Sequence, residues 1–209
     1  MENVDILVPP TFEKSGVVKS RSQAIAHGDW IGTFNLWILQ DKPTPSVIYQ
    51  QRSSRSTWAP NKLDVTAGGH YMAGETIFDG LREVDEELGK QYKKDEIVYL
   101  GRKLHVGPDV HGSLHHNVVD IFFVTDNSSL ETYQLEINEV SAIVSCPVDD
   151  LIKLHLDKKE FLACGLNNEG ENFEVKVNHD SFPYNWDNYH FKISLLARRY
   201  LNGEKDLYY

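Results

Sequence analysis

The chain has 209 residues, of which 41% are hydrophobic and 25% are charged, and its formal net charge at pH 7 is −10. This length and composition are those of a soluble globular protein that can bury a core, and the negative charge argues against nucleic acid or an anionic membrane as the main ligand. The two cysteines, Cys146 and Cys164, have no metal-ligand spacing and indicate a reducing compartment rather than a disulfide framework.

The N-terminal stretch MENVDILVPP lacks the basic and then apolar segments of a signal peptide. No apolar run reaches the length of a transmembrane helix. We therefore expect a cytoplasmic protein. The sequence has neither an internal repeat nor a low-complexity linker, so residues 1–209 are expected to form one domain.

The first half of the chain predicts strands separated by polar turns. Apolar runs bounded by turn residues favour strands. The expected elements are strands at 32–40 and 45–52, a polar loop at 53–62 and a short strand at 63–67. The last of these strands leads directly into Gly68 and Gly69.

The next segment predicts a helix over residues 76–88. Thr76 followed by Asp79 resembles a capping box at the start, and Gly89 is placed to end the helix in a left-handed conformation. The apolar residues recur at spacings of four, three and four and form one face, which consists of Ile77, Leu81, Val84 and Leu88.

The second half of the chain predicts further strands and two helices. The expected strands lie at 96–106, 117–126, 139–148 and 173–177, and the expected helices at 148–156 and 186–203. Residues 158–186 are otherwise expected to be irregular and to serve as a lid or as a dimer contact. Strands on both sides of a mid-chain helix, with another helix at the end, favour a mixed sheet with helices packed on it.

Three carboxylates lie close together on the helix at 76–88. Glu83 is three residues from Glu86 and four from Glu87, and like charges at these spacings destabilise a helix by about 0.2–0.5 kcal/mol per pair. Glu86 and Glu87 also lie in the last turn, where the helix dipole favours cations. Clustered carboxylates are the hard oxygen ligands that Mg²⁺ or Mn²⁺ prefers, so the cluster predicts a metal site.

The motif GG-x-x-x-x-GE … REV-x-EELG, at residues 68–90, resembles the Nudix box. The flanking segments HGDWIGTFNLWIL, QRSSRSTWAPNKLDVTAGGH and VVDIFFV … EINEVSAI are similar to the Nudix branch close to isopentenyl-diphosphate isomerase. The resemblance covers about residues 20–150 and leaves 158–209 as a C-terminal extension with a closing helix. It implies an α/β fold, a Nudix-type α/β/α sandwich with a mixed central sheet.

The resemblance also implies an activity. A Nudix protein would cleave a diphosphate linkage in a nucleoside diphosphate derivative or another organic diphosphate, using Mg²⁺ or Mn²⁺ and a metal-activated water that attacks phosphorus. The expected partner is therefore a small-molecule diphosphate, with no nucleic acid and no membrane. A homodimer is compatible with the sequence.

The resemblance assigns metal and catalytic roles to particular residues. Glu83 and Glu87 would be the main metal ligands. Glu86 would be a further ligand or act through water, and the carbonyl of Gly69 would be an additional ligand. Glu139, at the start of a later strand, would be a ligand or the general base.

Other residues are expected to bind substrate or to support the box. Arg52, Arg55 and His70 are expected to contact substrate, since Arg suits bidentate phosphate contacts. Arg82 would hold the helical carboxylates by ion pairing. Six residues separate Glu75 from Arg82 where the family pattern has seven, so that either Glu75 or Gly74 takes the first acidic position of the box.

Two alternatives stay open. An isopentenyl-diphosphate isomerase-like enzyme would carry a catalytic cysteine in the segment DVTAGGH, where this chain has Thr66, Ala67 and Gly68. A non-catalytic, nucleotide-sensing Nudix module would usually have a degraded box, whereas all three helical glutamates are present here.

Four histidines surround a loop that contains Gly and Pro, namely His105, His111, His115 and His116. They lack the paired spacing of a zinc site and are expected to be structural or surface residues. Trp30, Phe34 and Trp58 are candidates to stack on a base or to form a pocket wall, but aromatic residues at such positions more often belong to the core, which is the expectation here.

Overall fold

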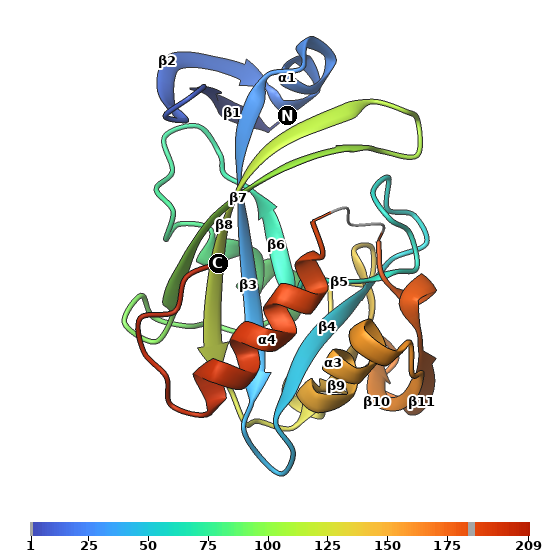
Figure 1. Cartoon of the computed structure of the whole chain (residues 1–209). Coiled ribbons are helices and arrows are strands. Elements are labelled where there is room, and N and C mark those ends of the chain that lie inside the picture. The colour runs from blue at the N-terminus through green and yellow to red at the C-terminus, as the bar shows by residue number, and fades with distance from the viewer. Residues whose placement is uncertain (1, 184–186) are drawn as a thin grey trace.

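The computed structural model describes residues 2–183 and 187–209, whose strands form one mixed sheet (Figure 1). Its main path runs β11-β10-β9-β4-β3-β1-β2, β8 lies beside β3, and β7 lies beside β8. Two short strands, β5 and β6, pair with β4 and β3. The strands are β1 (Asn3–Val8), β2 (Glu13–Ser20), β3 (Trp30–Gln40), β4 (Ser46–Arg52), β5 (Leu63–Asp64), β6 (Ala67–His70), β7 (Val98–Pro108), β8 (Leu114–Thr125), β9 (Val140–Pro147), β10 (Phe161–Asn167) and β11 (Asn172–Val177).

Helices cover both faces of this sheet. Figure 1 shows α4 crossing in front of β3 and β4 with α3 beside it, while α2 lies behind the sheet. The predicted α/β/α sandwich with a mixed sheet is confirmed. The helices are α1 (Arg21–His27), α2 (Leu81–Leu88), α3 (Val148–Asp157) and α4 (Tyr189–Leu201), with short 3₁₀ turns η1 (Leu130–Thr132) and η2 (His179–Ser181). None of the helices in the described residues is long and apolar enough to cross a bilayer.

The central strand β3 divides the core into two layers. Successive side chains of a strand point to opposite faces. Trp37 and Leu39 therefore pack with residues of α3 and α4, whereas Phe34 and Ile38 pack with residues of α2. Burial on both faces explains why β3 is apolar along most of its length rather than alternating.

The N-terminal residues form a unit that the sequence did not predict. β1 and β2 make an antiparallel hairpin, and α1 follows at once. The Ser20 hydroxyl accepts a hydrogen bond from the Gln23 amide, and the Gln23 side-chain oxygen accepts one from the Ser20 amide, which is a capping box at the start of α1. This unit joins the sheet through β1, which pairs with β3.

The expectation that residues 158–186 are irregular apart from one strand is wrong. β10 and β11 form a hairpin that extends the sheet, with Phe161 opposite Val177. The turn between them is stabilised by the Asn167 side chain, which accepts hydrogen bonds from the amides of Glu169 and Glu171. Local turn chemistry of this kind outweighs the polar character of the segment. Tyr184 and Trp186, the latter the expected first residue of the closing helix, lie outside the described residues.

The box helix is shorter than predicted, because α2 begins at Leu81 and not at Thr76. Residues 76–80 form successive tight turns instead, in which the Asp79 carboxylate accepts hydrogen bonds from both the amide and the hydroxyl of Thr76. The chain has one residue fewer than the family pattern between Glu75 and Arg82, and this turn segment occupies that interval. The helical residues from Arg82 onward therefore keep their mutual spacing. Gly89 ends the helix with a left-handed φ of 62°, as predicted.

Gly80→Ala is expected to destabilise the fold by about 1–3 kcal/mol, as overpacking of a core does. A Cβ at Gly80 would lie 2.4–2.6 Å from the side chain of the buried Phe34, so α2 would have to move away from the sheet. Denaturant unfolding measures the change. Asp85→Ala on the exposed side of the same helix is the control, expected to stay within about 0.5 kcal/mol, and equal stability of the two variants would contradict this packing.

Candidate active site

A cavity of about 490 Å³ lies at the meeting point of the box and several segments far from it in sequence. Its walls come from β3, β6, α2, the loop at 53–62, the paired strands β7 and β8, and the first residue of α4. Of the residues that the sequence assigned to a site, the cavity brings together Arg52, Arg55, Gly69, His70, Glu83, Glu87 and Glu139.

Glu87 is a buried carboxylate on the inner side of α2. Only 4% of this residue is exposed, and its Oε2 atom accepts a hydrogen bond of 3.1 Å from the Gly68 amide. Burial raises the pKa of Glu87 well above its usual value, and the neighbouring charge of Glu83 acts in the same direction. The two carboxylates therefore repel each other in a place where water screens them poorly.

Glu83 lies one helical turn earlier and faces Gly69. A Cβ at Gly69 would be 2.2–2.5 Å from the Glu83 carboxyl group, so only glycine leaves room for this arrangement. Burial raises the pKa of Glu83 to about 7, although the adjacent Arg82 works against this shift. The Glu83 carboxyl group thus occupies the space that the missing side chain of Gly69 leaves free.

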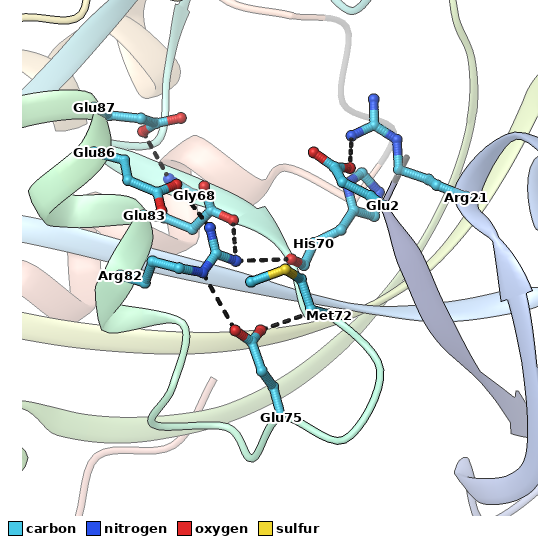
Figure 2. A network of polar contacts seen from close by, with 10 residues as sticks. All are labelled: Glu2, Arg21, Gly68, His70, Met72, Glu75, Arg82, Glu83, Glu86 and Glu87. Atoms are coloured by element: carbon cyan, nitrogen blue, oxygen red, sulfur yellow. Dashed lines mark hydrogen bonds and ion pairs between the residues drawn. The ribbon is translucent and has the colours of Figure 1, made fainter.

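Arg82 joins the carboxylates of the box, as Figure 2 shows. Its guanidinium donates hydrogen bonds to Glu75 (3.2 Å), Glu83 (2.9 Å) and Glu86 (2.7 Å). The other carboxylate oxygen of Glu75 accepts from the Met72 amide at 2.7 Å. Glu75, and not Gly74, therefore supplies the carboxylate beside the box arginine, despite the missing residue between them.

Glu86 is placed differently from the other two helical glutamates. Its side chain is 55% exposed, pairs with Arg82 and does not line the cavity. Glu86 and Glu87 are adjacent in sequence, so their side chains project in different directions from the helix, and only Glu87 turns into the cavity. Glu86 therefore borders the site rather than entering it.

Two arginines and a further carboxylate edge the same cavity. The Arg52 Nε donates to the Ser56 hydroxyl and to the Trp58 carbonyl, which fixes the guanidinium, and Arg55 donates to the Asn138 side chain at 3.2 Å. Glu139 is exposed, and its charge contributes to the raised pKa of both Glu83 and Glu87. The polar loop and the start of β9 thus face the box helix across the cavity.

His70 lies in the cavity wall with its Nε2 atom buried. Burial lowers the pKa of its imidazole to about 3, so the ring is neutral at physiological pH. Asn117 lies beside this ring and slightly favours its protonated form, although Nε2 and the Asn117 Oδ1 are not in hydrogen-bond geometry.

The cavity also contains residues that the sequence reasoning did not place there. His105 and His115, expected to be structural or surface residues, line it, and so does Trp58, which was expected in the core. Asn117 and Lys103 were not singled out at all. The signal that could have found them is the alternation of polar residues along β7 and β8.

The donor set fits a divalent cation. Carboxylate oxygens from Glu83 and Glu87 lie next to the Gly68–Gly69 backbone, and these are hard ligands of the kind that Mg²⁺ and Mn²⁺ accept. Among residues 2–183 and 187–209, no three His, Cys, Asp or Glu side chains already converge into a metal cage. A cation held by Glu83 and Glu87 would therefore take its remaining ligands from the backbone, from Glu139 or from water.

Comparison with known proteins identifies the family. The family model of the NUDIX domain matches residues 32–164, which include the box and most of the cavity residues. The chain belongs to the Nudix family. As a Nudix hydrolase it belongs to enzymes that generally use divalent metal ions.

Relatives of this Nudix hydrolase extend over most of its length. It is 32% identical over 190 residues to an uncharacterized Nudix hydrolase of Clostridium acetobutylicum, covering 86% of this chain and 89% of that protein. It is 29% identical over 155 residues to Nudix hydrolase 3 of Arabidopsis thaliana, covering 71% of this chain but only 20% of that much longer protein. These matches establish the family and not the branch close to isopentenyl-diphosphate isomerase that the flanking residues resemble.

Solved structures agree on the fold of this Nudix hydrolase. DR0079 of Deinococcus radiodurans aligns with a TM-score of 0.56 and 17% identity, covering 76% of this chain and 91% of that one. A MutT/nudix family protein of Enterococcus faecalis aligns with a TM-score of 0.52 and 14% identity, covering 87% of this chain and 70% of that one.

Proposed function

We propose that this Nudix hydrolase cleaves a diphosphate linkage in a nucleoside diphosphate derivative or another organic diphosphate, with Mg²⁺ or Mn²⁺ as cofactor. The observation that carries the proposal is a pair of carboxylates in a cavity that Arg52 and Arg55 edge. Glu87 is buried, and the side chain of Glu83 is only 13% exposed. Two like charges held close together away from water destabilise the fold. A bound cation that both carboxylates contact removes this repulsion and can at the same time bind a diphosphate.

In this proposal the box residues hold the cation. Glu83 and Glu87 are its main ligands, the Gly69 carbonyl is an additional one, and Glu86 contributes through water from the edge of the site. Arg82 keeps Glu83 and Glu86 in position through its hydrogen bonds. When bound, the cation would neutralise charge on the diphosphate oxygens and make a water molecule more acidic.

The remaining residues bind and position the reactants. Arg52 and Arg55 contact the diphosphate oxygens, and His70 supplies an uncharged hydrogen-bonding group. The oxygen of the attacking water forms a bond to phosphorus, its proton passes to Glu139, and the bridging P–O bond breaks with the electron pair leaving on the departing phosphate. Glu139 is suited to this step because it is exposed and faces both Glu83 and Glu87 across the cavity.

The isomerase alternative is not favoured by the residues in the segment DVTAGGH, where an isomerase would carry its catalytic cysteine. Thr66 is fully buried, and its hydroxyl donates to the Ile48 carbonyl and accepts from the Ile38 amide, so it has a structural role. Within the described residues neither cysteine lines the cavity, since Cys146 is buried in the core beside α3 and Cys164 is exposed on β10. A thiol acid–base group is therefore missing.

The function is tested with purified protein and a panel of diphosphates in Mg²⁺ or Mn²⁺. The panel comprises nucleotide sugars, ADP-ribose, dinucleoside polyphosphates, CDP-alcohols, thiamine diphosphate and prenyl diphosphates. We expect metal-dependent phosphate products from at least one class. Tight nucleotide binding without any turnover would instead favour the sensing module.

Cytoplasmic location, homodimer formation and a single domain over residues 1–209 stay predictions.

The metal-free protein is expected to lose stability as the pH rises from about 5 to 8. The folded-state pKa of Glu83 is about 7 against an ordinary value of 4.5, and that of Glu87 is raised in the same direction. The folded state therefore binds more protons than the unfolded state in this range, so its extra stability is complete below pH 4.5 and is lost as the pH passes 7.

Thermal melting in EDTA across this pH range measures the effect. Glu83→Gln should flatten the profile, and Mg²⁺ should restore stability at pH 8 in the wild type only. A wild-type melting temperature that rises with pH would show that the carboxylates are not held as described.

A further inference from the structure

The strands β7 and β8 form a long antiparallel pair, the arm, whose outer end projects past the rest of the sheet (Figure 1). At His116 and Asn117 the arm still lies beside β3, which pairs with β8 from Trp30 onward. Along the arm His105 lies opposite Asn117 and Gly107 opposite His115. Directly opposite residues share a face of the ribbon. His105, His115 and Asn117 all line the cavity, so this face of the arm is a wall of the site.

The outer part of the arm departs from the usual polarity. An antiparallel ribbon normally turns apolar residues inward and polar residues to solvent. Here Leu104, Val106 and Leu114 on the outward face are 41%, 38% and 50% exposed, and His116 is a polar residue among them, opposite Val106. The arm thus turns polar side chains toward the cavity and leaves apolar side chains exposed to solvent, against the usual pattern of a ribbon. Departures of this kind are expected at functional sites.

His105 and Asn117 on the inward face are uncharged, and each both donates and accepts hydrogen bonds. Burial lowers the pKa of His105 to about 4, so its ring is neutral at physiological pH. In the described residues, the Asn117 Oδ1, the His70 Nε2 and the Gln50 Nε2 are buried without a hydrogen-bond partner, and all three residues line this cavity. A ligand with several hydroxyl groups satisfies such a set, because each hydroxyl also donates and accepts.

The wall is held in place by the loop at 53–62. The Trp58 ring packs edge-on against His105 at a centroid distance of 5.1 Å, and the Val110 amide near the arm tip donates to the Thr57 carbonyl at 2.9 Å. Two other polar residues of this face already have partners. Lys103 is engaged by Asp187 at 3.4 Å and lies over the Tyr189 ring, and His115 lies 3.4 Å from Asp109. The groups left to bind a ligand are therefore the neutral ones.

We propose that the inner face of the β7–β8 arm, through His105 and Asn117, binds a hydroxyl-rich moiety such as a sugar attached to the diphosphate of the substrate. This assignment rests on the proposed hydrolase function and adds the class of substrate. A prenyl chain is disfavoured, because it would leave the buried polar atoms unpaired, and sites built to hydrogen-bond a substrate reject analogues that lack the partner group by orders of magnitude.

Two inner-face variants and one outer-face control test the proposal. Asn117→Leu and His105→Phe keep the size of the side chain and remove its hydrogen bonds, and Val106→Thr makes a small change on the outward face. Substrates are ADP-ribose and ADP-glucose against isopentenyl and geranyl diphosphate. We expect the wild type to prefer the hydroxyl-rich pair, and each inner-face variant to lose about tenfold or more in kcat/KM for that pair, through KM.

The same variants should keep or raise kcat/KM for the prenyl diphosphates, because they remove polar atoms that a prenyl chain leaves unpaired. Val106→Thr should leave both pairs unchanged. Wild-type preference for prenyl diphosphates, or equal losses on both pairs, would overturn the proposal while the hydrolase function stood.

A binding measurement separates the two proposals further, because it needs no turnover. By calorimetry, Asn117→Leu should weaken binding of ribose 5-phosphate about tenfold and leave binding of inorganic phosphate unchanged. If no diphosphate is cleaved but this difference is seen, the hydrolase proposal fails and the sugar site remains. If ribose 5-phosphate binds wild type and variant equally, the sugar site is refuted.

Discussion

Replacing Glu87 with Gln is expected to lower kcat/KM by at least about a hundredfold and, in the absence of metal, to raise the melting temperature. The activity falls because a main ligand of the cation, worth several kcal/mol of charge stabilisation, is removed. The stability rises because the amide keeps the shape of the side chain and can still accept from the Gly68 amide, while the buried repulsion with Glu83 disappears. Steady-state kinetics with Mg²⁺ and thermal melting in EDTA measure the two effects.

Asp85→Asn on the exposed side of α2 is the matched control, because it makes the same chemical change without touching the cavity. It should leave kcat/KM within about twofold and the melting temperature nearly unchanged. Near-normal activity of Glu87→Gln would show that this carboxylate does not hold the cation. A lower melting temperature in EDTA would show that the buried charge is stabilised by contacts other than those described.

Replacing Gly69 with Ala is expected to abolish most of the activity while leaving the fold nearly as stable. The added methyl group would lie within 2.5 Å of the Glu83 carboxyl group. That group is the end of a flexible side chain, so it can swing away with little effect on the core, but it then leaves the position proposed for the metal ligand. We expect a loss of about a hundredfold or more in kcat/KM, because a small misplacement at a reacting site costs about that much.

The neighbouring glycine provides the comparison. A Cβ at Gly68 would lie 2.7 Å from the Phe34 carbonyl oxygen, which belongs to the backbone of β3 and cannot swing aside. Gly68→Ala should therefore lower the free energy of unfolding by about 1–3 kcal/mol, unlike Gly69→Ala. Denaturant unfolding and kinetics on both variants separate the two outcomes, and an active Gly69→Ala variant would refute the fit between Gly69 and Glu83.

The box is the part of the site that could be read from the sequence. The spacing of Glu83 and Glu87 on a helix is a local property, and the structure places both carboxylates in one cavity. The ion pairing expected of Arg82 is also local and is present. Glu86 was grouped with them because spacing alone does not say which side of a short helix faces the cavity and which faces solvent.

The rest of the site depends on contacts between segments far apart in the chain. The face of β7 and β8 that lines the cavity follows from the register of His105 with Asn117 and from the packing of Trp58 on the arm. Neither is encoded by a short pattern. The same reasoning explains the error at β10 and β11, since a hairpin with a polar turn and polar flanks gains its stability by pairing with β9 at the edge of the sheet.

The closing helix α4 has a consequence for how this enzyme can be shortened. The NUDIX family model stops at residue 164, yet Ile193 and Ala197 of α4 belong to the same buried cluster as Trp37 and Tyr49 of the central strands. A fragment trimmed to the family boundaries would expose these two large aromatic side chains to water and would lose Tyr189 from the wall of the cavity. We therefore propose that residues 32–164 are not a minimal folding unit, and that α4 must be kept in any excised version.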